Sequence, residues 1–336
     1  MRKFARPIVL VSRCLEFDNV RYDGKVVPCR IVKDLIPVVD FLKVCPEYEI
    51  GLGVPRDPIR IVKQKGNYRL VQPKTGEDVT EKMENFTKNF MEDLKDVDGF
   101  IFKSRSPTIG VRDIKVYSGA EAAPVIEKGM GFFAGKIFEK YYGYPIEEDD
   151  RLRNYHIRHH FLTQLYTFAD LRTHYSSGSI KELQDFNEKN RYLFTCYEPT
   201  IYEQMCELLE NSDTESSLDD TGSQAENEVF QKYLSLLKTL LTRPGDVDSR
   251  EHVARQIFSN FRDQVSENEI IFFEQLLENF SLNRIGEDAL IEVLRLYVLR
   301  FDGDNIDNYT FLYPYPEVLR LSGDEKRDKD YWNTGK

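Results

Sequence analysis

Four side chains able to do chemistry follow three short apolar runs in the first third of the chain. Cys14 comes after the first run, Cys45 and Glu47 come after the second, and Ser106 comes after the third. The runs are residues 7–11, 41–44 and 99–102. Short apolar runs of this kind are typical of buried parallel strands, and open α/β sheets bind ligands at the carboxyl ends of their strands. We therefore expect these four side chains to share one pocket.

The two thiols can be interpreted in two ways. A cysteine near a helix N-terminus has a lowered pKa and can act as a nucleophile or a metal ligand. A free cysteine is nevertheless more often a small buried hydrophobic residue. Because Cys14 and Cys45 each end an apolar run, and Pro46 and Glu47 follow the second, we weigh the two interpretations about evenly.

The polar candidates also have simple alternatives. Glu47 could donate or accept protons, or it could be a solvated loop carboxylate. Ser106 could orient a water or a substrate, or it could only form a turn before Pro107. Lys103 and Arg105 could hold an anionic group, although basic residues beside a turn are common.

The histidines give weaker evidence for a metal or catalytic site than the cysteines do. His156, His159 and His160 have the i, i+3, i+4 spacing of one helix face, which could seat a metal. No neighbouring cysteine or carboxylate completes such a site, so we favour a solvated helix face. All five histidines lie beyond residue 150. A cysteine hydrolase would need a histidine base near Cys14 or Cys45, and this function ranks last.

The periodicity of apolar residues divides the chain near residue 150. Residues 1–150 alternate apolar runs with helical segments, which predicts an α/β domain with a largely parallel sheet. Its other expected elements are helices at 33–42, 78–94 and 131–141 and a hairpin through 59–62 and 68–72. The acidic stretch 145–150 is the expected boundary.

Residues 151–320 predict an all-α domain. Helical spacing recurs at 152–175, 229–243, 250–265 and 288–301, and capping-box patterns begin at Ser179 and Ser266. Residues 212–228 hold six acidic and no basic residues, which is typical of a disordered loop. Residues 321–336 form a polar tail.

Composition limits the function classes. The chain has 41% hydrophobic and 31% charged residues and no apolar run long enough to cross a membrane. The basic residues 1–6 precede too short an apolar run for a signal peptide, so we expect a cytoplasmic protein. The odd number of cysteines, five, without a CxxC pair, opposes a disulfide framework or a zinc site.

Charge is unevenly distributed along the chain. The first 150 residues carry 25 Lys and Arg against 24 Asp and Glu, whereas the remainder carries 21 against 33. An acidic protein is poorly suited to broad contact with a nucleic-acid backbone, whose binding depends on cations that neutralise phosphates. We expect a small or locally recognised substrate in the first half, and the acidic second half could contact a protein partner.

Four ordered motifs resemble those of the thiouracil desulfidase family. They are VSRC at 11–14, VRYDG at 20–24, VCPE at 44–47 and KSRSP at 103–107. The resemblance covers most of residues 5–145, and residues 151–316 resemble the YbgA-type helical domain that is often fused to it.

The resemblance implies a specific chemistry. Three cysteines would hold a [4Fe-4S] cluster whose open iron takes the sulfur of a thiolated pyrimidine, and water would replace that sulfur without net redox. Cys14 and Cys45 would be two of the cluster ligands. Glu47 would handle protons, and Ser106 would position the water.

This chain departs from the family at the third ligand. The family motif reads Ser-Pro-Ser-Cys-Gly, whereas this chain has Thr108 and Ile109 at its third and fourth positions. The hydrocarbon of Ile109 cannot bind iron, and Cys29, which could fold back to help, lies in no family motif. In the second domain, residues 186–191 read Phe-Asn-Glu-Lys-Asn-Arg where the resemblance implies a Phe-His…His-Lys pattern.

Two functions are consistent with these residues. The first is a desulfidase that acts on a thiolated nucleobase or a similar thiocarbonyl compound through an iron–sulfur cluster. The second is a binding protein on the same fold that has no cluster. Cys14, Cys45, Glu47 and Ser106 favour the enzyme, whereas Ile109 favours the binding protein.

Overall fold

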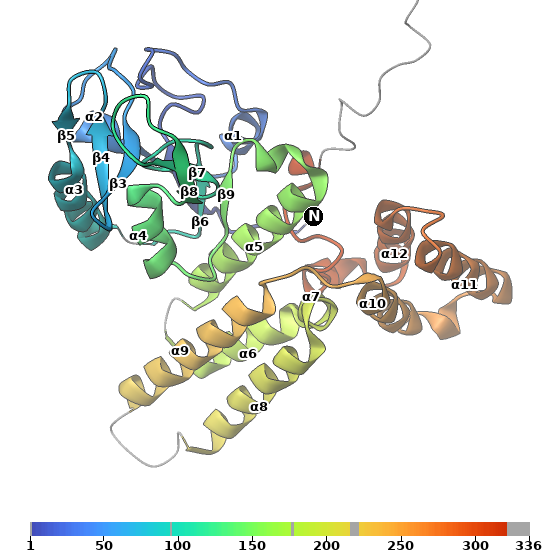
Figure 1. The fold of residues 1–336 in the computed structure, drawn as a ribbon. Coiled ribbons are helices and arrows are strands. Elements are labelled where there is room, and N and C mark those ends of the chain that lie inside the picture. Colours follow the sequence, from blue (N-terminus) through green and yellow to red (C-terminus); the bar gives the residue numbers. More distant parts are fainter. Residues whose placement is uncertain (1, 95, 176–177, 216–221, 321–336) are drawn as a thin grey trace, which may run out of the picture. The chain divides into compact units, whose positions relative to one another are not determined.

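The computed structural model describes residues 2–94, 96–175, 178–215 and 222–320 (Figure 1). The chain divides into two compact units, which we call the α/β unit and the helical unit. Within the described residues, the α/β unit comprises 6–169 with 318–320, and the helical unit comprises 170–317 with 2–5. An α/β region followed by a helical region is the fold class that the sequence predicts. The tail at 321–336 lies outside the described residues.

The sheet that carries the candidate residues is entirely parallel. It consists of β1 (Ile8–Ser12), β2 (Asp40–Val44), β6 (Gly99–Phe102) and β9 (Ile146–Glu148), in the order β2-β1-β6-β9. Central strands β1 and β6 are almost fully buried, which explains why their sequences are continuous apolar runs. The first three of these strands coincide with the three predicted runs to within one residue.

A second, mixed sheet completes the α/β unit. Its order is β5-β4-β3-β7-β8, and β3 pairs with β7 in parallel while the other pairings are antiparallel. The strands are β3 (Arg60–Gln64), β4 (Asn67–Gln72), β5 (Glu77–Asp78), β7 (Ile114–Tyr117) and β8 (Val125–Gly129). The sequence predicted the β3–β4 hairpin but not that it belongs to a separate sheet.

Helices of the α/β unit pack around a continuous hydrophobic core. They are α1 (Arg30–Leu35), α2 (Pro46–Glu49), α3 (Thr80–Asp93), α4 (Phe132–Lys140) and α5 (Tyr155–His174). Met83 of α3 and Phe133 of α4 are fully buried and belong to the same core cluster as Phe100 and Phe102 of β6. The helix expected at 33–42 ends earlier because Pro37 has no N–H with which to continue it.

The helical unit begins inside α5, at Asp170. Its further helices are α6 (Ile180–Lys189), α7 (Arg191–Tyr197), α8 (Pro199–Glu215), α9 (Gly222–Leu240), α10 (Val247–Ser259), α11 (Glu267–Ser281) and α12 (Glu287–Phe301). The two predicted N-caps are present. The Ser179 hydroxyl accepts from Glu182 N, and Ser266 and Glu269 form a complete capping box.

Two acidic segments contain more regular structure than the sequence indicates. The acidic stretch 145–150 contains β9, and its Glu147, Glu148 and Asp149 are buried. The disordered loop expected at 212–228 is wrong at both ends, since α8 extends to Glu215 and α9 begins at Gly222. Acidic composition opposes burial but not helix formation, because glutamate is a good helix former. Residues 216–221 lie outside the described part.

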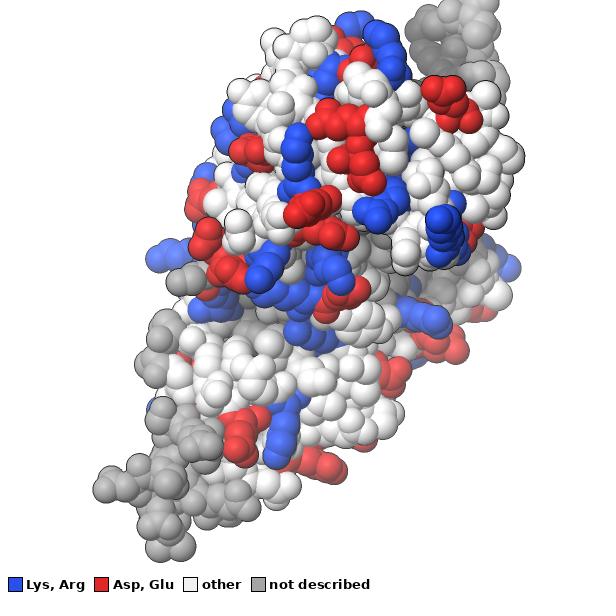
Figure 2. Space-filling model, turned by 60° about the vertical axis from the view of Figure 1, so that its left-hand side comes forward, with Lys and Arg blue, Asp and Glu red and all other residues white. Residues whose placement is uncertain are grey.

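On the face drawn in Figure 2, acidic and basic side chains are interspersed. Among the described residues, no helix is both long enough and apolar enough to span a membrane.

Candidate functional site

The ends of β1, β2 and β6 open into one pocket of the α/β unit. Its volume is about 450 Å³, within the range typical of small-molecule sites. Parallel register brings the strand ends together, since Ser12 lies opposite Val44 and the Arg13 amide donates to the Val44 carbonyl. The lining includes all four candidate residues, Cys14, Cys45, Glu47 and Ser106. The strand ends therefore meet as the apolar runs predict.

Both pocket thiols lie in an environment that favours the neutral form. Burial raises the pKa of Cys14 to about 11, and the charge of Glu47 adds to this shift. Burial raises the pKa of Cys45 to about 12, again with a contribution from Glu47. Of the two interpretations open from the sequence, these shifts favour the buried thiol over the thiol with a lowered pKa. The helix that follows Cys45 has only four residues, and its field does not offset desolvation and a nearby carboxylate.

Glu47 is a largely buried residue of the pocket lining, and it accepts hydrogen bonds from two hydroxyl groups. The Thr108 hydroxyl donates to Glu47 Oε1 at 2.6 Å, and the hydroxyl oxygens of Ser106 and Thr108 are 2.9 Å apart. The Ser106 hydroxyl is also 3.3 Å from Glu47 Oε1. This geometry joins Ser106 and Glu47, which the sequence placed on different strand ends, into one polar network.

Arg56 contacts the other side of Glu47. Its guanidinium lies 3.9 Å from Glu47 Oε2 and 3.7 Å from the Cys45 sulfur, and its side chain is 6% exposed. Arg56 also donates to the carbonyls of Val20 and Gly53, at 2.9 and 3.0 Å. A buried carboxylate beside a buried guanidinium avoids the cost of an unpaired charge. Arg56 lies outside the four sequence motifs, which do not indicate this role.

The two basic candidates have different surroundings. Lys103 is paired with buried Asp149 at 2.9 Å, so most of its charge is already compensated. Arg105 is exposed, lines the pocket and has a left-handed backbone, with φ of +63°. Among the described residues, no hydrogen bond or ion pair engages its guanidinium. Arg105 is therefore the better candidate for an anionic group on a ligand.

The loop that carries Ser106 is fixed by buried carboxylates of β9 and the residue after it. Asp149 accepts from the Ser104 amide at 2.7 Å, and Glu148 accepts from the amides of Val111 and Arg112 at 2.7 and 3.1 Å. The sequence pattern predicts only an acidic boundary here. These carboxylates belong to four consecutive acidic residues, 147–150, so no alternation with apolar residues indicates their burial.

Other candidates lie apart from this pocket. Cys29 is buried at the start of α1 and is not among the lining residues. The ring of His159 stacks on Tyr155, and His156 is exposed on the same helix. Across the described part of the chain, no group of three or more His, Cys, Asp or Glu side chains is arranged to hold a metal ion.

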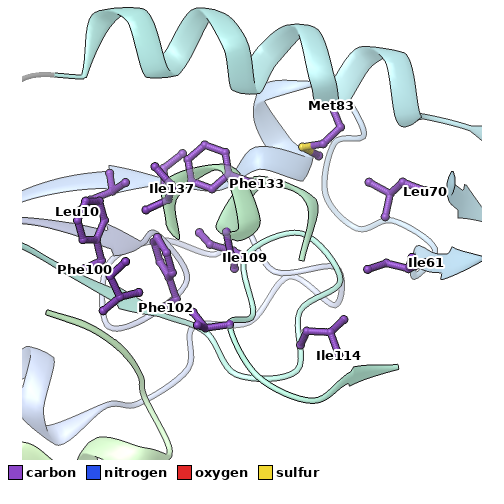
Figure 3. Close-up of a cluster of buried hydrophobic side chains, with 14 of the residues drawn as sticks. Leu10, Ile61, Leu70, Met83, Phe100, Phe102, Ile109, Ile114, Phe133 and Ile137 are labelled. Atoms are coloured by element: carbon purple, nitrogen blue, oxygen red, sulfur yellow. The ribbon is translucent and has the colours of Figure 1, made fainter. Parts of the chain in front are cut away.

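Ile109 occupies the side of the pocket where the family motif supplies a third thiol. It lines the pocket, yet it is 4% exposed and belongs to the hydrophobic core. Figure 3 shows its side chain among Phe102, Phe133 and Ile137. Two thiols and a hydrocarbon do not fit a [4Fe-4S] cluster held by three cysteine thiolates, because the third iron ligand is missing.

Comparisons with known proteins agree with this architecture. Residues 9–149 match the family model described as 2-thiouracil desulfurase. The first domain resembles the thiouracil desulfidases. Residues 191–316 match a family of unknown function, DUF1722, which corresponds to the YbgA-type helical domain expected from the sequence. The resemblance stated from the motifs is therefore confirmed for both parts of the chain.

One curated protein and one solved structure are similar to the first domain. The uncharacterized protein YbbK of Bacillus subtilis (strain 168) is 27% identical over 154 residues, which is 44% of this chain and 99% of YbbK. A solved structure of the [4Fe-4S]-dependent thiouracil desulfidase TudS is 25% identical and covers 44% of this chain and 93% of that chain, with a TM-score of 0.34.

Proposed function

We propose that the α/β unit binds a small thiolated pyrimidine, or a related thiocarbonyl compound, in the Cys14–Cys45 pocket. One observation carries the proposal: two thiols, a carboxylate and a hydroxyl from three separate strand ends line the same cavity. The match of residues 9–149 to the 2-thiouracil desulfurase model supports the choice of ligand class.

The chemistry of the lining suits such a ligand. A thiolated pyrimidine has N–H donors, oxygen or sulfur acceptors and two apolar ring faces. Glu47 and Ser106 can pair with its polar edge, while the thiols of Cys14 and Cys45 are soft partners for sulfur. The Ile109 side chain supplies an apolar surface for a ring face. The pocket also leaves room for a substituent on the ring, and Arg105 would pair with one that is anionic.

From the residues that line the pocket, we propose that this binding takes place without an iron–sulfur cluster. The pocket offers two cysteines, and Ile109 closes the third position with hydrocarbon. The second candidate is removal of the ligand's sulfur, with Glu47 and Ser106 acting on a water. The Ser106–Thr108–Glu47 network favours it, because that network places a carboxylate and two hydroxyls beside the thiols.

Calorimetric titration of the full chain under reducing conditions tests the binding proposal. We expect 2-thiouracil or 4-thiouracil to bind more tightly than uracil, because only the thio compounds offer sulfur to the thiols. Cys45→Ser should weaken this preference, whereas Cys29→Ser, whose thiol lies outside the pocket, serves as the matched control. Equal affinity for uracil and the thio compounds, or an unchanged preference in Cys45→Ser, would contradict the proposal.

The second candidate has its own assay. Incubation with either thiouracil, followed by measurement of released sulfide and of uracil, detects removal of the sulfur. Release that disappears in Glu47→Gln but persists in Cys29→Ser would establish the enzyme. Tight binding without release would leave binding as the function of this pocket.

A further inference from the structure

We infer that Thr108 positions the Glu47 carboxylate, and that the first turn of α4 fixes Thr108 in turn. Thr108 is fully buried, and its hydroxyl makes the shortest of the hydrogen bonds to Glu47, at 2.6 Å. The inference rests on the proposed function, since Glu47 matters to a ligand only if the pocket binds one.

The direction of the hydrogen bonds follows from what each group can donate or accept. Because a carboxylate only accepts, the Thr108 hydrogen goes to Glu47 Oε1 at 2.6 Å. The Ser106 hydroxyl oxygen accepts from the amides of Thr108 and Ile109, at 3.3 and 3.2 Å, and its hydrogen faces both the Thr108 oxygen at 2.9 Å and Glu47 Oε1 at 3.3 Å. Hydrogen bonds in a chain polarise and strengthen one another. Thr108 therefore makes the closer contact to Glu47 and also holds Ser106 beside it.

The backbone of Thr108 is held by the start of α4. The amides of Phe133 and Ala134, which have no partner within the helix, donate to the Thr108 carbonyl at 2.9 and 3.0 Å. Phe132 N donates to the preceding carbonyl, that of Pro107, at 3.2 Å. Two successive residues of the pocket loop thus cap the helix, and this fixes the direction of the Thr108 side chain.

Gly131 makes this close approach possible. A Cβ atom at position 131 would lie 2.4 Å from the carbonyl carbon and oxygen of Thr108. No side chain fits in that space, so any larger residue must push the loop away from α4. The position of the Glu47 carboxylate consequently depends on a glycine that does not line the pocket.

Isosteric substitution of Thr108 tests the inference with 2-thiouracil as the probe. Thr108→Val keeps the shape but removes the hydroxyl, and we expect Kd to rise about tenfold or more, as for loss of a hydrogen bond to a charged group. Thr108→Ser restores the hydroxyl and should stay within about threefold of the wild type. Thr87→Val is the matched control, because Thr87 is a buried threonine of the same unit whose hydroxyl donates to the Met83 carbonyl of its own helix.

Each outcome decides between positioning and a general structural role. Wild-type affinity in Thr108→Val, or an equal loss in Thr87→Val, overturns the inference. If Thr108→Val does not fold, Gly131→Ala replaces it, and unchanged affinity in that variant is the contrary result. If the wild type binds no 2-thiouracil, the proposed function fails by itself. Crystal structures of the wild type, Thr108→Ser and Thr108→Val then test the inference by the position of the Glu47 carboxylate. We expect it to move in Thr108→Val but not in Thr108→Ser, and an unmoved carboxylate in Thr108→Val overturns the inference.

Discussion

Buried polar side chains gather in both units of the protein, but their surroundings differ. In the α/β unit, Glu47 lies at a cavity of about 450 Å³, and its neighbours include two hydroxyls, the Cys45 thiol and one cation, Arg56 at 3.9 Å. In the helical unit, Asp170 is enclosed by basic side chains, with Lys189 at 3.0 Å, His174 at 3.1 Å and Arg2 at 3.5 Å. The first arrangement leaves polar groups available to a ligand. The second neutralises its charge internally, and we interpret it as structural.

The largest expected effect is on the stability of the helical unit. Asp170→Ala leaves Lys189 and the buried Arg2 without their carboxylate, which should cost about 3–5 kcal/mol. Asp263→Ala, on an exposed short helix of the same unit, is the control and should have little effect. Hydrogen exchange with mass spectrometry can resolve the two units. Loss of protection in the helical unit with unchanged 2-thiouracil binding is expected, and a loss of ligand affinity would contradict the structural interpretation.

A second prediction concerns the pocket thiols. With pKa values of about 11 and about 12, Cys14 and Cys45 are almost fully protonated at neutral pH. Iodoacetamide at pH 8 should therefore modify both at least about 100-fold more slowly than an ordinary peptide cysteine, and Cys45 more slowly than Cys14, because the thiolate is the nucleophile. Peptide mapping measures each rate separately. Fast modification of either thiol would show that the pocket supports a thiolate and would favour metal binding.

The smallest expected effect is a pH dependence of the helical unit. The hydrogen bond to Asp170 raises the pKa of His174 in the folded state. A raised folded pKa gives a contribution that is complete below the unfolded value, about 6.5, and is lost as pH rises through the folded value. Urea unfolding between pH 6 and pH 9 should thus show a small decline in stability that His174→Gln removes. An identical pH profile in the variant would contradict this assignment.

The sequence predicted the parallel strands and the pocket because both depend on local patterns. Continuous apolar runs identify buried strands, and the first polar residues after them mark the carboxyl edge. The sequence alone therefore suffices to group Cys14, Cys45, Glu47 and Ser106 at one edge of a sheet. The small residue shifts at strand ends, such as Ser12 within β1, did not affect this result.

The rest of the site depends on contacts between distant segments, which a single sequence does not show. Thr108 and Arg56 reach Glu47 from other loops, and Asp149 reaches the Ser104 amide across 45 residues. The sequence left the sign of the thiol pKa shifts open for the same reason. It depends on how deeply Cys14 and Cys45 are buried and on the nearby Glu47 charge, and neither is visible in the motifs.

We propose that this pocket binds its small molecule without an iron–sulfur cluster, because Ile109 stands in place of the third cysteine ligand. The measurement that tests it most directly is iron and acid-labile sulfide content after anaerobic reconstitution of the wild type and Ile109→Cys in parallel. We expect little iron in the wild type and uptake near four irons per chain, the content of one [4Fe-4S] cluster, in Ile109→Cys. A wild type that takes up about four irons by itself would contradict the claim.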